Sequence, residues 1–354
     1  MGSNEGPEHA RPPVVVATLE ARHEAAWEAY VARHPEATLF HTLAWKRVLE
    51  RTFSCRPYYL LALRGETVCG VLPLWHFRSP LFGRALISVP YAVYGGILAD
   101  DEEAERRLRA QAVALAEGHR VDYLELRNHV PSRSGWPTKS LYVTFLRPLS
   151  PDNEANLKAI PRKQRAMIRK AERKGVRAVT DDDLEAFYAI YSRSVHAHGT
   201  PVYPYSFFRH IQETLGEACR ITFCTDAQGR RVATVMTFYF RDRVMPYFGG
   251  GLPEARALQA FDYMYWDVMA RAAEAGYTCF DYGRSKEGTG SYRFKKHWGF
   301  APTPLPYEYH LVRAREMPNV SPANPKYQRL IRAWRALPYP VTRILGPMIA
   351  RHLA

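Results

Sequence analysis

The chain of 354 residues is longer than one hydrophobic core usually supports, so its length favours two domains. Its composition, 47% hydrophobic and 24% charged, is that of a globular protein and excludes a largely disordered one. A net charge of +14 favours polyanionic partners such as RNA, nucleotide diphosphates or an anionic membrane surface. A solvated basic surface without any such partner is the plainer alternative.

The cysteines and the apolar runs indicate where the protein works. Five cysteines form no C-x-x-C pair and leave an odd number, which favours a reducing compartment. The N-terminal segment MGSNEGPEHARPP lacks a basic region followed by an apolar one, and no run of about 18 apolar residues occurs. We therefore expect a cytoplasmic protein that does not span a membrane.

The first half of the chain contains a series of predicted elements that recurs in the second half. A strand pair joined by a turn is predicted at 58–77 and again at 219–240. A strand that ends in two glycines follows each pair: VPYAVYGG ends at Gly96, and VMPYFGG ends at Gly250.

The series continues in the same order in both halves. Apolar residues at three- and four-residue intervals predict long helices at 102–117 and 257–275. Each helix leads to a strand that ends in arginine, VDYLELR at Arg127 and TCFDYGR at Arg284. Because order and spacing agree, we predict an internal duplication.

A basic segment lies between the two copies. Residues 161–174 predict a helix rich in arginine and lysine, with Pro161 in its first turn and Gly175 as its C-cap. This helix is either a solvated bridge between two domains or a cationic rail for phosphate groups, and the sequence favours neither.

The tail from Pro322 onward alternates bulky apolar and basic residues. Leu330, Ile331 and Trp334 would share one helix face. Such a pattern can lie in a membrane interface, but the helical pieces are short and broken by proline. We therefore favour docking of the tail on the protein's own surface over membrane contact.

The segment FDYGRSKEGTGSYRFKKHWGF, residues 280–300, combines glycines, cations and aromatic residues. It predicts a strand that leads into a binding loop, in which glycines let the backbone approach a ligand closely. Lys295 and Lys296 lie in sequence between Phe294 and Trp298, and partial burial between these rings would lower the pKa of Lys295. A surface turn with a solvated charge cluster is the alternative.

The repeated order of elements is that of the Gcn5-related N-acyltransferase (GNAT) fold, a mixed, mostly antiparallel sheet with helices on both faces. With the motifs GTPVYP (199–204), YFGGG (247–251) and FDYGRSKEGTGSYRFKKHWG, the chain resembles the FemAB family from about Phe40 to Tyr309. FemAB proteins are aminoacyl-tRNA-dependent peptidyltransferases that build peptidoglycan bridges. The chain most resembles FemAB-like proteins associated with exopolysaccharide and PEP-CTERM/exosortase gene clusters.

The resemblance implies that the second module holds the chemistry and that the first helps to bind the acceptor. By the F-K-x-x-[FW]-G motif, Lys295 takes the position of a lysine at the reacting centre, where it would hold a phosphate or the oxyanion of the transfer intermediate. Lys296 has no such match. The chain has no heptad run like the coiled-coil arm of some cell-wall members, so any RNA-binding surface would be smaller.

The sequence also bears on the acyl donor. Coenzyme A users of this fold carry a glycine-rich loop that binds pyrophosphate at a helix N-terminus. Here GGGLPEARALQAF has no glycine after Gly251 until Gly276, and the first copy, GGILADDEEAERR, is acidic. The sequence therefore disfavours acetyl-CoA without excluding it.

Other polar residues leave alternatives open. His196 and His198 would share one strand face, but no third ligand has a recognisable spacing, so a metal site is disfavoured. Acceptor binding or a general-base role suits His196 better, and a structural role suits His198. Asp281 would act as a base, orient Arg284, or form a buried salt bridge.

We thus expect an α+β protein with tandem GNAT-like modules in mixed α/β sheets, a basic linker helix and a short helical tail. The expected ranges are 1–150 for the acceptor-binding module, 151–178 for the linker, 179–316 for the catalytic module, and 317–354 for the tail.

The expected function is transfer of an aminoacyl or acyl group to an amine of a cell-envelope or exopolysaccharide precursor, with aminoacyl-tRNA as donor. An acyl-CoA-dependent N-acyltransferase and a non-enzymatic basic scaffold that docks on membrane or nucleic acid are the alternatives. The expected partner is a nucleotide- or lipid-linked saccharide or peptide, with tRNA and a membrane surface met by the tail as further candidates; no metal or cofactor is expected. The expected catalytic residues are Lys295 and Asp281. The expected substrate-binding residues are Arg284, Ser285, Gly288, Thr289, Gly290, Tyr292, Lys296, Trp298, His196, Thr200, Tyr203, Tyr247, Gly249 and Gly250.

Overall fold

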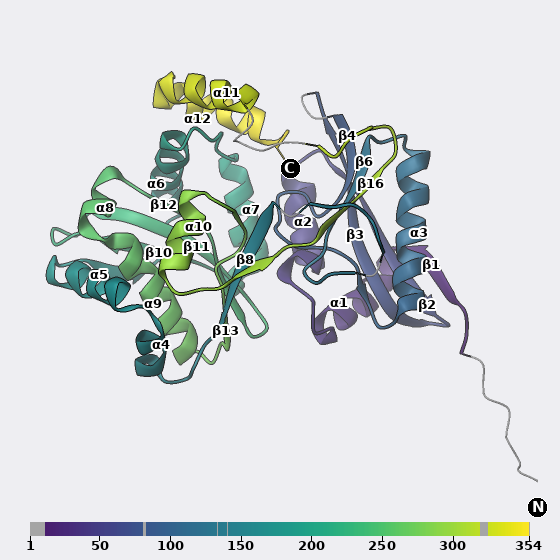
Figure 1. Ribbon diagram of the computed structural model, residues 1–354, viewed down its shortest axis with the longest axis horizontal. Coiled ribbons are helices and arrows are strands. Elements are labelled where there is room, and N and C mark those ends of the chain that lie inside the picture. The colour runs from purple at the N-terminus through teal and green to yellow at the C-terminus, as the bar shows by residue number, and fades with distance from the viewer. Residues whose placement is uncertain (1–10, 81–82, 133, 140, 319–324, 354) are drawn as a thin grey trace, which may run out of the picture.

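The computed structural model describes residues 11–80, 83–132, 134–139, 141–318 and 325–353. Two lobes lie side by side, and each is a mixed sheet covered by helices on both faces (Figure 1). The C-terminal helices lie against the second lobe.

The first lobe contains a sheet in the order β1-β2-β3-β4-β6-β16-β7, with β5 paired to β3. Helices α1 and α2 cover one face and α3 the other. The bounds are β1 Val14–Thr18, α1 Glu24–Arg33, α2 Leu43–Thr52, β2 Arg56–Arg64, β3 Thr67–Ser79, β4 Gly83–Ser88, β5 Leu98–Ala99, α3 Glu102–Gly118, β6 Tyr123–Arg127, β7 Thr138–Lys139 and β16 Tyr307–Leu311.

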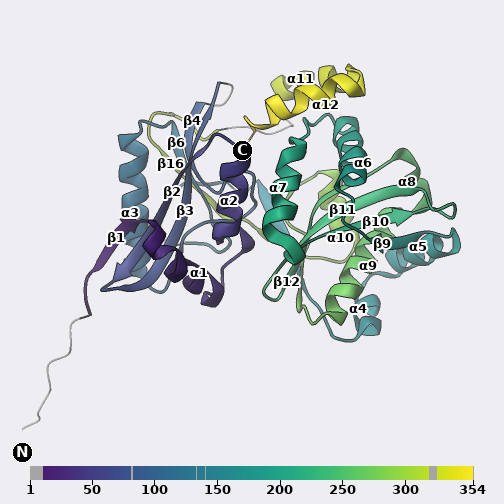
Figure 2. The same cartoon turned by 180° about the vertical axis from the view of Figure 1, so that it is seen from behind.

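The second lobe contains a sheet in the order β14-β8-β13-β12-β11-β10-β9, with β15 paired to β8. From behind, α7 of this lobe faces α2 of the first lobe (Figure 2). The bounds are β8 Tyr142–Pro148, α4 Asn153–Ala159, α5 Arg162–Arg173, β9 Arg177–Thr180, α6 Leu184–Ala197, α7 Tyr205–Leu215, β10 Cys219–Thr225, β11 Arg231–Phe240, β12 Arg243–Gly251, α8 Pro253–Leu258, α9 Ala260–Glu274, β13 Cys279–Asp281, β14 Ser285–Lys286, α10 Gly290–His297 and β15 Pro302–Pro304.

Local sequence explains helix α3. The Asp101 side chain caps its N-terminus by accepting a hydrogen bond from the Ala104 backbone N–H (3.0 Å). Three acidic residues in its first turn favour the positive end of the helix dipole. Apolar residues recur every four positions, and this stripe is buried on the sheet. Its members are Ala104, Leu108, Ala112 and Ala116.

The predicted duplication is confirmed. The hairpins β2–β3 and β10–β11, the helices α3 and α9, and the strands β6 and β13 follow one another in the predicted order. In both lobes a strand on the N-terminal side of the long helix pairs in parallel with the strand after that helix, as β4 with β6 and β12 with β13.

Several predicted elements differ from the structure. The strand expected to end at Gly96 instead ends at Ser88, because the Arg127 guanidinium donates to the carbonyls of Val89 and Ala92 and holds them in a loop. The helix expected at 257–275 is divided into α8 and α9 by Gln259, which has a φ of 59°.

The third difference lies in the segment 280–300. Its expected binding loop contains helix α10, because the Thr289 side chain caps a helical turn at Tyr292. The expected strand around His196 and His198 is likewise the end of helix α6. The strand expected to end at Arg284 ends at Asp281, because Gly283, with a φ of 65°, turns the chain there.

Two strands belong to the sheet of the opposite lobe. Strand β8 precedes the predicted boundary at residue 150 but pairs with β13, β14 and β15 of the second sheet. Strand β16 follows the second module but pairs with β6 and β7 of the first sheet. The predicted domain ranges stay a prediction, and the exchanged strands make us expect that neither range folds alone.

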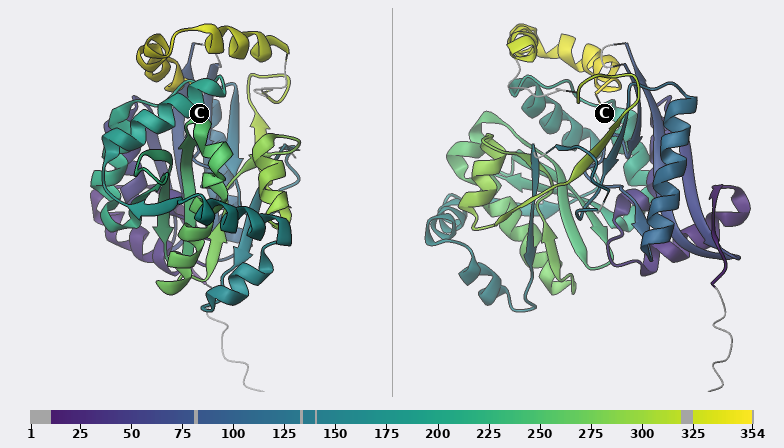
Figure 3. Two further views of the ribbon diagram at one scale, coloured as in Figure 1. Left: turned by 90° about the vertical axis from the view of Figure 1, so that its left-hand side faces the viewer. Right: turned by 45° about the vertical axis from the view of Figure 1, so that its right-hand side comes forward.

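The two C-terminal helices, α11 (Pro325–Ala336) and α12 (Tyr339–Ala350), lie across one end of the molecule (Figure 3). The Tyr339 and Ser192 hydroxyls share a hydrogen bond of 2.8 Å, and the Thr342 hydroxyl lies 3.0 Å from Nδ1 of His196. The predicted docking of the tail on the protein's own surface is confirmed.

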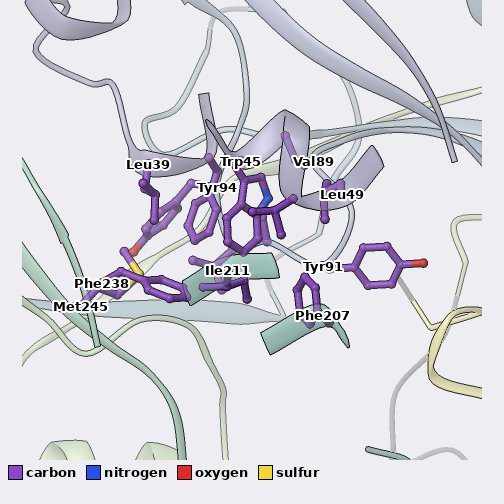
Figure 4. Packing of buried hydrophobic residues seen from close by; sticks show 14 of the residues in the cluster. Leu39, Trp45, Leu49, Val89, Tyr91, Tyr94, Phe207, Ile211, Phe238 and Met245 are labelled. Atoms are coloured by element: carbon purple, nitrogen blue, oxygen red, sulfur yellow. The ribbon is translucent and has the colours of Figure 1, made fainter. Parts of the chain in front are cut away.

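One aromatic core joins the two lobes. Trp45 of the first lobe meets Phe207 and Phe238 of the second in edge-to-face contacts, with ring centroids 6.1 and 5.9 Å apart (Figure 4). Such contacts add to the burial of large apolar surface. The lobes therefore pack as one body around the exchanged strands.

The exchanged strand β16 can be tested by replacing Glu308, which is 3% exposed and accepts hydrogen bonds from Arg109 (2.8 Å), Asn128 (2.8 Å) and Ser134 (2.7 Å). Glu308→Ala should lower the free energy of unfolding by about 2–4 kcal/mol, because buried donors lose their acceptor. Urea denaturation measures this change. The control Glu154→Ala, at an exposed carboxylate, should change it by less than about 0.5 kcal/mol. Equal effects of the two variants would contradict the buried role of β16.

Candidate functional site

Lys295 is the one buried residue of helix α10, with 8% of its surface exposed. Its Nζ donates to the carbonyl of Gly283 (2.9 Å) and to that of Arg284 (3.2 Å). Gly283 has a φ of 65°, a conformation that glycine adopts without strain, and this turn presents both carbonyls to the ammonium. Because an ammonium has three protons, one remains free for a ligand.

The surroundings of Lys295 lower the pKa of its amine. Burial lowers the pKa of Lys295 to about 7, the nearby Asp281 charge opposes this shift, and the Arg284 charge adds to it. The rings closest to Nζ are those of Phe145 and Tyr282, with centroids at 5.6 and 5.7 Å. The expected fall in pKa is thus found, but the rings responsible are not the expected Phe294 and Trp298. Trp298 is buried and donates its indole N–H to Asp262 (3.0 Å).

Asp281 ends strand β13 and is fully buried. Its Oδ1 accepts from the backbone of Gly283 (2.7 Å), from Tyr94 (3.2 Å) and from Thr144 (3.3 Å). Its Oδ2 has no hydrogen-bond partner among the described residues, and burial raises the pKa of the carboxyl. Neither the expected contact with Arg284 nor an ion pair with Lys295 is formed, so one carboxylate oxygen remains available.

The guanidinium of Arg284 lies among aromatic rings. It stacks on Tyr142 at 4.4 Å and on Tyr307 at 5.8 Å, and its Nη1 donates to the Tyr307 hydroxyl (3.3 Å). No carboxylate of the described chain forms an ion pair with it. Most of its donors are therefore free to bind an anion.

Arg127 occupies the equivalent position in the first lobe and lies near the ring of the same tyrosine. Its guanidinium is 5.7 Å from the Tyr307 ring, but Nε donates to Glu125 (2.7 Å), and Nη1 donates to the carbonyls of Val89 (2.8 Å) and Ala92 (2.7 Å). The duplicated arginines thus meet at the seam between the lobes. The charge of Arg127 is neutralised by Glu125, whereas Arg284 has no carboxylate partner among the described residues.

The parallel strand pairs also differ between the lobes. Strands β4 and β6 pair at four positions, whereas β12 and β13 pair at only two and then diverge. The Tyr265 side chain occupies the space where β12 and β13 separate. Its ring centroid lies 4.9 Å from that of Tyr282 on one side, and a Cβ added to Gly249 on the other side would lie 3.0 Å from its hydroxyl. A Cβ at Gly250 would lie 2.9 Å from Ser194 of α6, so this glycine permits close helix packing. Ligand contact by these two glycines stays a prediction.

The remaining predicted residues fall into three places. Tyr203 and Tyr247 are half-buried at the seam near Arg284. His196 and Thr200 lie under the tail, where they meet Thr342 and Trp334, and not beside Lys295. A third group surrounds the start of α10 near Lys295: Ser285, Gly288, Thr289, Gly290, Tyr292 and Lys296.

Sequence reasoning missed four residues that complete the site: Tyr94, Tyr142, Thr144 and Tyr307. Only Tyr94 carried a sequence signal, because it precedes the repeated glycine pair. Tyr142 and Thr144 lie on the exchanged strand β8, and Tyr307 lies on the exchanged strand β16, so their positions depend on long-range pairing.

No group of three or more His, Cys, Asp or Glu side chains in the described ranges is arranged to hold a metal ion. Within the same ranges, no helix has the length and apolar content needed to cross a bilayer.

A family match covers the site. Residues 162–296 match the family described as the acetyltransferase (GNAT) domain. The match runs from α5 into α10 and includes Asp281, Arg284 and Lys295. The second lobe is therefore similar to GNAT acetyltransferase domains over this range, which supports an N-acyltransferase. No curated protein matches the sequence significantly.

Solved structures share the arrangement of both lobes. The crystal structure of FemX aligns with a TM-score of 0.66 and 14% identity, covering 90% of this chain and 100% of that one. A tandem GNAT protein from the clavulanic acid biosynthesis pathway aligns with a TM-score of 0.54 and 14% identity, covering 86% and 99%. The C-terminal domain of a putative lysylphosphatidylglycerol synthetase from Agrobacterium fabrum aligns with a TM-score of 0.56 and 14% identity, covering 82% and 91%. At these identities the likeness shows the fold, and the predicted tandem GNAT fold class is confirmed.

The burial of Lys295 predicts a pH dependence of stability. Because its pKa falls from 10.5 to about 7, the unfolded chain holds a proton in this window that the folded protein lacks. The free energy of unfolding should therefore rise with pH from about 7 to 10, by about 1.4 kcal/mol per pH unit relative to Lys295→Met. Urea denaturation at several pH values measures both slopes. Lys158→Met, at an exposed lysine, should keep the wild-type slope; the same slope in Lys295→Met would show that Lys295 titrates normally.

Proposed function

We propose that the protein is a FemAB-like N-acyltransferase that moves an aminoacyl group from aminoacyl-tRNA to an amine of a cell-envelope or exopolysaccharide precursor. One observation carries the proposal: in the GNAT lobe, a buried lysine with one unused proton lies beside an arginine without a carboxylate partner. With one buried Asp281 nearby, the two cations leave the site positive. A site of this charge suits phosphates and a developing oxyanion.

The proposed chemistry is direct transfer. The acceptor amine attacks the carbonyl carbon of the aminoacyl ester, the new C–N bond forms, and the C–O bond to the ribose breaks. In its protonated form Lys295 has one free N–H, which would donate to the carbonyl oxygen as it becomes negative. The amine loses a proton, and Asp281, whose raised pKa and unpartnered Oδ2 suit a base, would accept it. This proton would then pass to the departing ribose oxygen, which leaves as a hydroxyl and regenerates the carboxylate.

The basic helix α5 supports an RNA-borne donor. It is not a bridge between the lobes, because Gln164, Ile168 and Ala171 are buried and the helix packs on α9. Its cations project from the lobe along one surface. The exposed members are Arg162, Lys163, Arg169, Lys170, Arg173 and Lys174. The cationic-rail alternative is therefore the one we adopt, with the rail contacting tRNA phosphates.

An acyl-CoA donor is the second candidate, because the matched family is described as an acetyltransferase. Two features oppose it. Tyr265 fills the divergence between β12 and β13, and a Cβ at Gly251 would lie 2.6 Å from Phe261, so the segment after β12 is closely packed. Titration calorimetry with coenzyme A and with charged tRNA separates the candidates, and tight binding of coenzyme A alone would favour the second.

The first functional prediction concerns turnover. Lys295→Ala should lower the rate of transfer from charged tRNA by about 100-fold or more, as expected for loss of an oxyanion donor. Transfer of a radiolabelled amino acid to a cell-envelope precursor measures the rate, and thermal unfolding checks that the variant folds. Lys158→Ala, at an exposed lysine, should retain wild-type turnover. A folded Lys295→Ala variant with wild-type turnover would rule out this role, and binding that depends on salt but not on Lys295 would favour the scaffold alternative.

The second functional prediction concerns binding. Arg284→Ala should raise the dissociation constant of a nucleotide-linked saccharide or of charged tRNA by about 10- to 100-fold, because a charged hydrogen bond is lost. Arg284→Lys should recover only part of this loss, since an ammonium lacks the planar fork of a guanidinium. Titration calorimetry compares both variants with Arg209→Ala, which removes an exposed arginine of α7. Unchanged affinity in Arg284→Ala would place the anion elsewhere.

A further inference from the structure

Helix α12 of the tail exposes its large apolar side chains and buries its small ones. Thr342, Gly346 and Ala350 recur every four residues and face the second lobe. A Cβ at Gly346 would lie 3.0 Å from Val202, so this face is closely packed. The opposite face carries apolar residues at three- and four-residue intervals, with Ile344 70% exposed. Its members are Val341, Ile344, Leu345 and Met348.

Helix α11 and the turn that follows it also expose large apolar side chains. Leu330 is 59% exposed, and Leu337 at the turn into α12 is 37% exposed. Six of the eleven large hydrophobic side chains exposed by the described residues belong to these two helices and the turn between them, so the apolar surface is concentrated there. A water-facing helix normally buries such a stripe, and an exposed one marks a binding surface.

The charge of the tail is of one sign. No acidic residue follows Glu316 in the sequence. Five arginines of the two helices and the residues after them are exposed: Arg329, Arg332, Arg335, Arg343 and Arg351. Apolar side chains flanked by arginines without acidic neighbours are typical of a helix that lies in the interface of an anionic bilayer.

We propose that α11 and α12 dock the protein on an anionic lipid surface, with the stripe of α12 inserted between the headgroups and the arginines on lipid phosphates. A second copy of the chain fits this surface poorly, because the same arginines would face one another across the contact. RNA would pair with the arginines but would leave the apolar stripe in water. The charge and the stripe together therefore select a lipid surface.

The docked tail would lie next to the seam. The Tyr91 hydroxyl donates to the carbonyl of Arg351 (2.6 Å), and the Tyr247 hydroxyl donates to the carbonyl of Tyr91 (3.3 Å). Tyr203 contacts Tyr91 edge to face, with ring centroids 5.9 Å apart. This chain of contacts connects the lipid-facing helices to the surroundings of Arg284. In an extension that rests on the proposed function, the acceptor is therefore lipid-linked.

The test uses the full chain and vesicles without any substrate, so its outcome does not depend on activity. Co-sedimentation should show binding to vesicles of equal parts phosphatidylglycerol and phosphatidylcholine, and much weaker binding to phosphatidylcholine alone. Ile344→Glu with Met348→Glu should weaken binding at least about tenfold, because two apolar side chains leave the bilayer. Arg329→Gln and Arg332→Gln should each weaken binding to the anionic vesicles about fivefold.

The matched control is Val15→Glu with Val179→Glu, which places the same charges at exposed apolar positions outside the tail, 61% and 46% exposed. This variant should bind vesicles like the wild type, and all variants should keep the wild-type circular dichroism spectrum and melting temperature. The proposal is overturned by absence of binding to anionic vesicles, or by equal loss of binding in the control. A third outcome would also overturn it: the wild type does not bind vesicles but self-associates or binds RNA, and the Ile344→Glu/Met348→Glu variant loses that self-association or RNA binding.

Discussion

The pairing of strand β8 with the second sheet is the constraint on which the site depends. In the sequence, β8 lies at the end of the first module, yet in the structure it pairs with β13, β14 and β15 of the second sheet. The segment between β14 and β15 contains helix α10, so β8 fixes both ends of the helix that carries Lys295. Three of its side chains also contact the site. The Tyr142 ring lies against the Arg284 guanidinium, the Thr144 hydroxyl donates to Asp281, and the Phe145 ring lies near the Lys295 ammonium.

The duplication explains why the two lobes resemble each other, and the charges explain how they differ. Each copy carries an arginine at the end of its parallel strand or just after it, and both guanidinium groups lie near the ring of Tyr307 on strand β16. In the first lobe, Glu125 and two backbone carbonyls occupy the arginine, which therefore has a structural role. In the second lobe, Arg284 keeps free donors and Lys295 lies beside it. The two copies of the fold thus have different roles: the first lobe supports the structure, and the second lobe can bind an anion.

Sequence patterns predicted the elements that depend on local interactions. The hairpins, α3, the basic helix α5 and the arginine-ended strand β6 follow from turn residues, apolar spacing and repetition. The exchange of β8 and β16 could not be predicted in this way, because strand partners far apart in sequence leave no local pattern. The same limit explains the site: Lys295 and Arg284 were identified from a motif, whereas Tyr142, Thr144 and Tyr307 reach them only through the exchanged strands. The end of β4 at Ser88 was missed because a distant side chain, Arg127, holds the following loop.

The central claim is that the fold holds the Lys295 ammonium in a buried position where it gives up its proton near neutral pH. Nuclear magnetic resonance of lysine labelled at Cε measures this directly, since the chemical shift of each Cε follows the protonation of its amine. We predict one lysine signal that titrates with a midpoint near pH 7 and is missing from the spectrum of Lys295→Met. The other signals should titrate near the ordinary value of about 10.4. A Lys295 signal that titrates with these others would contradict the account.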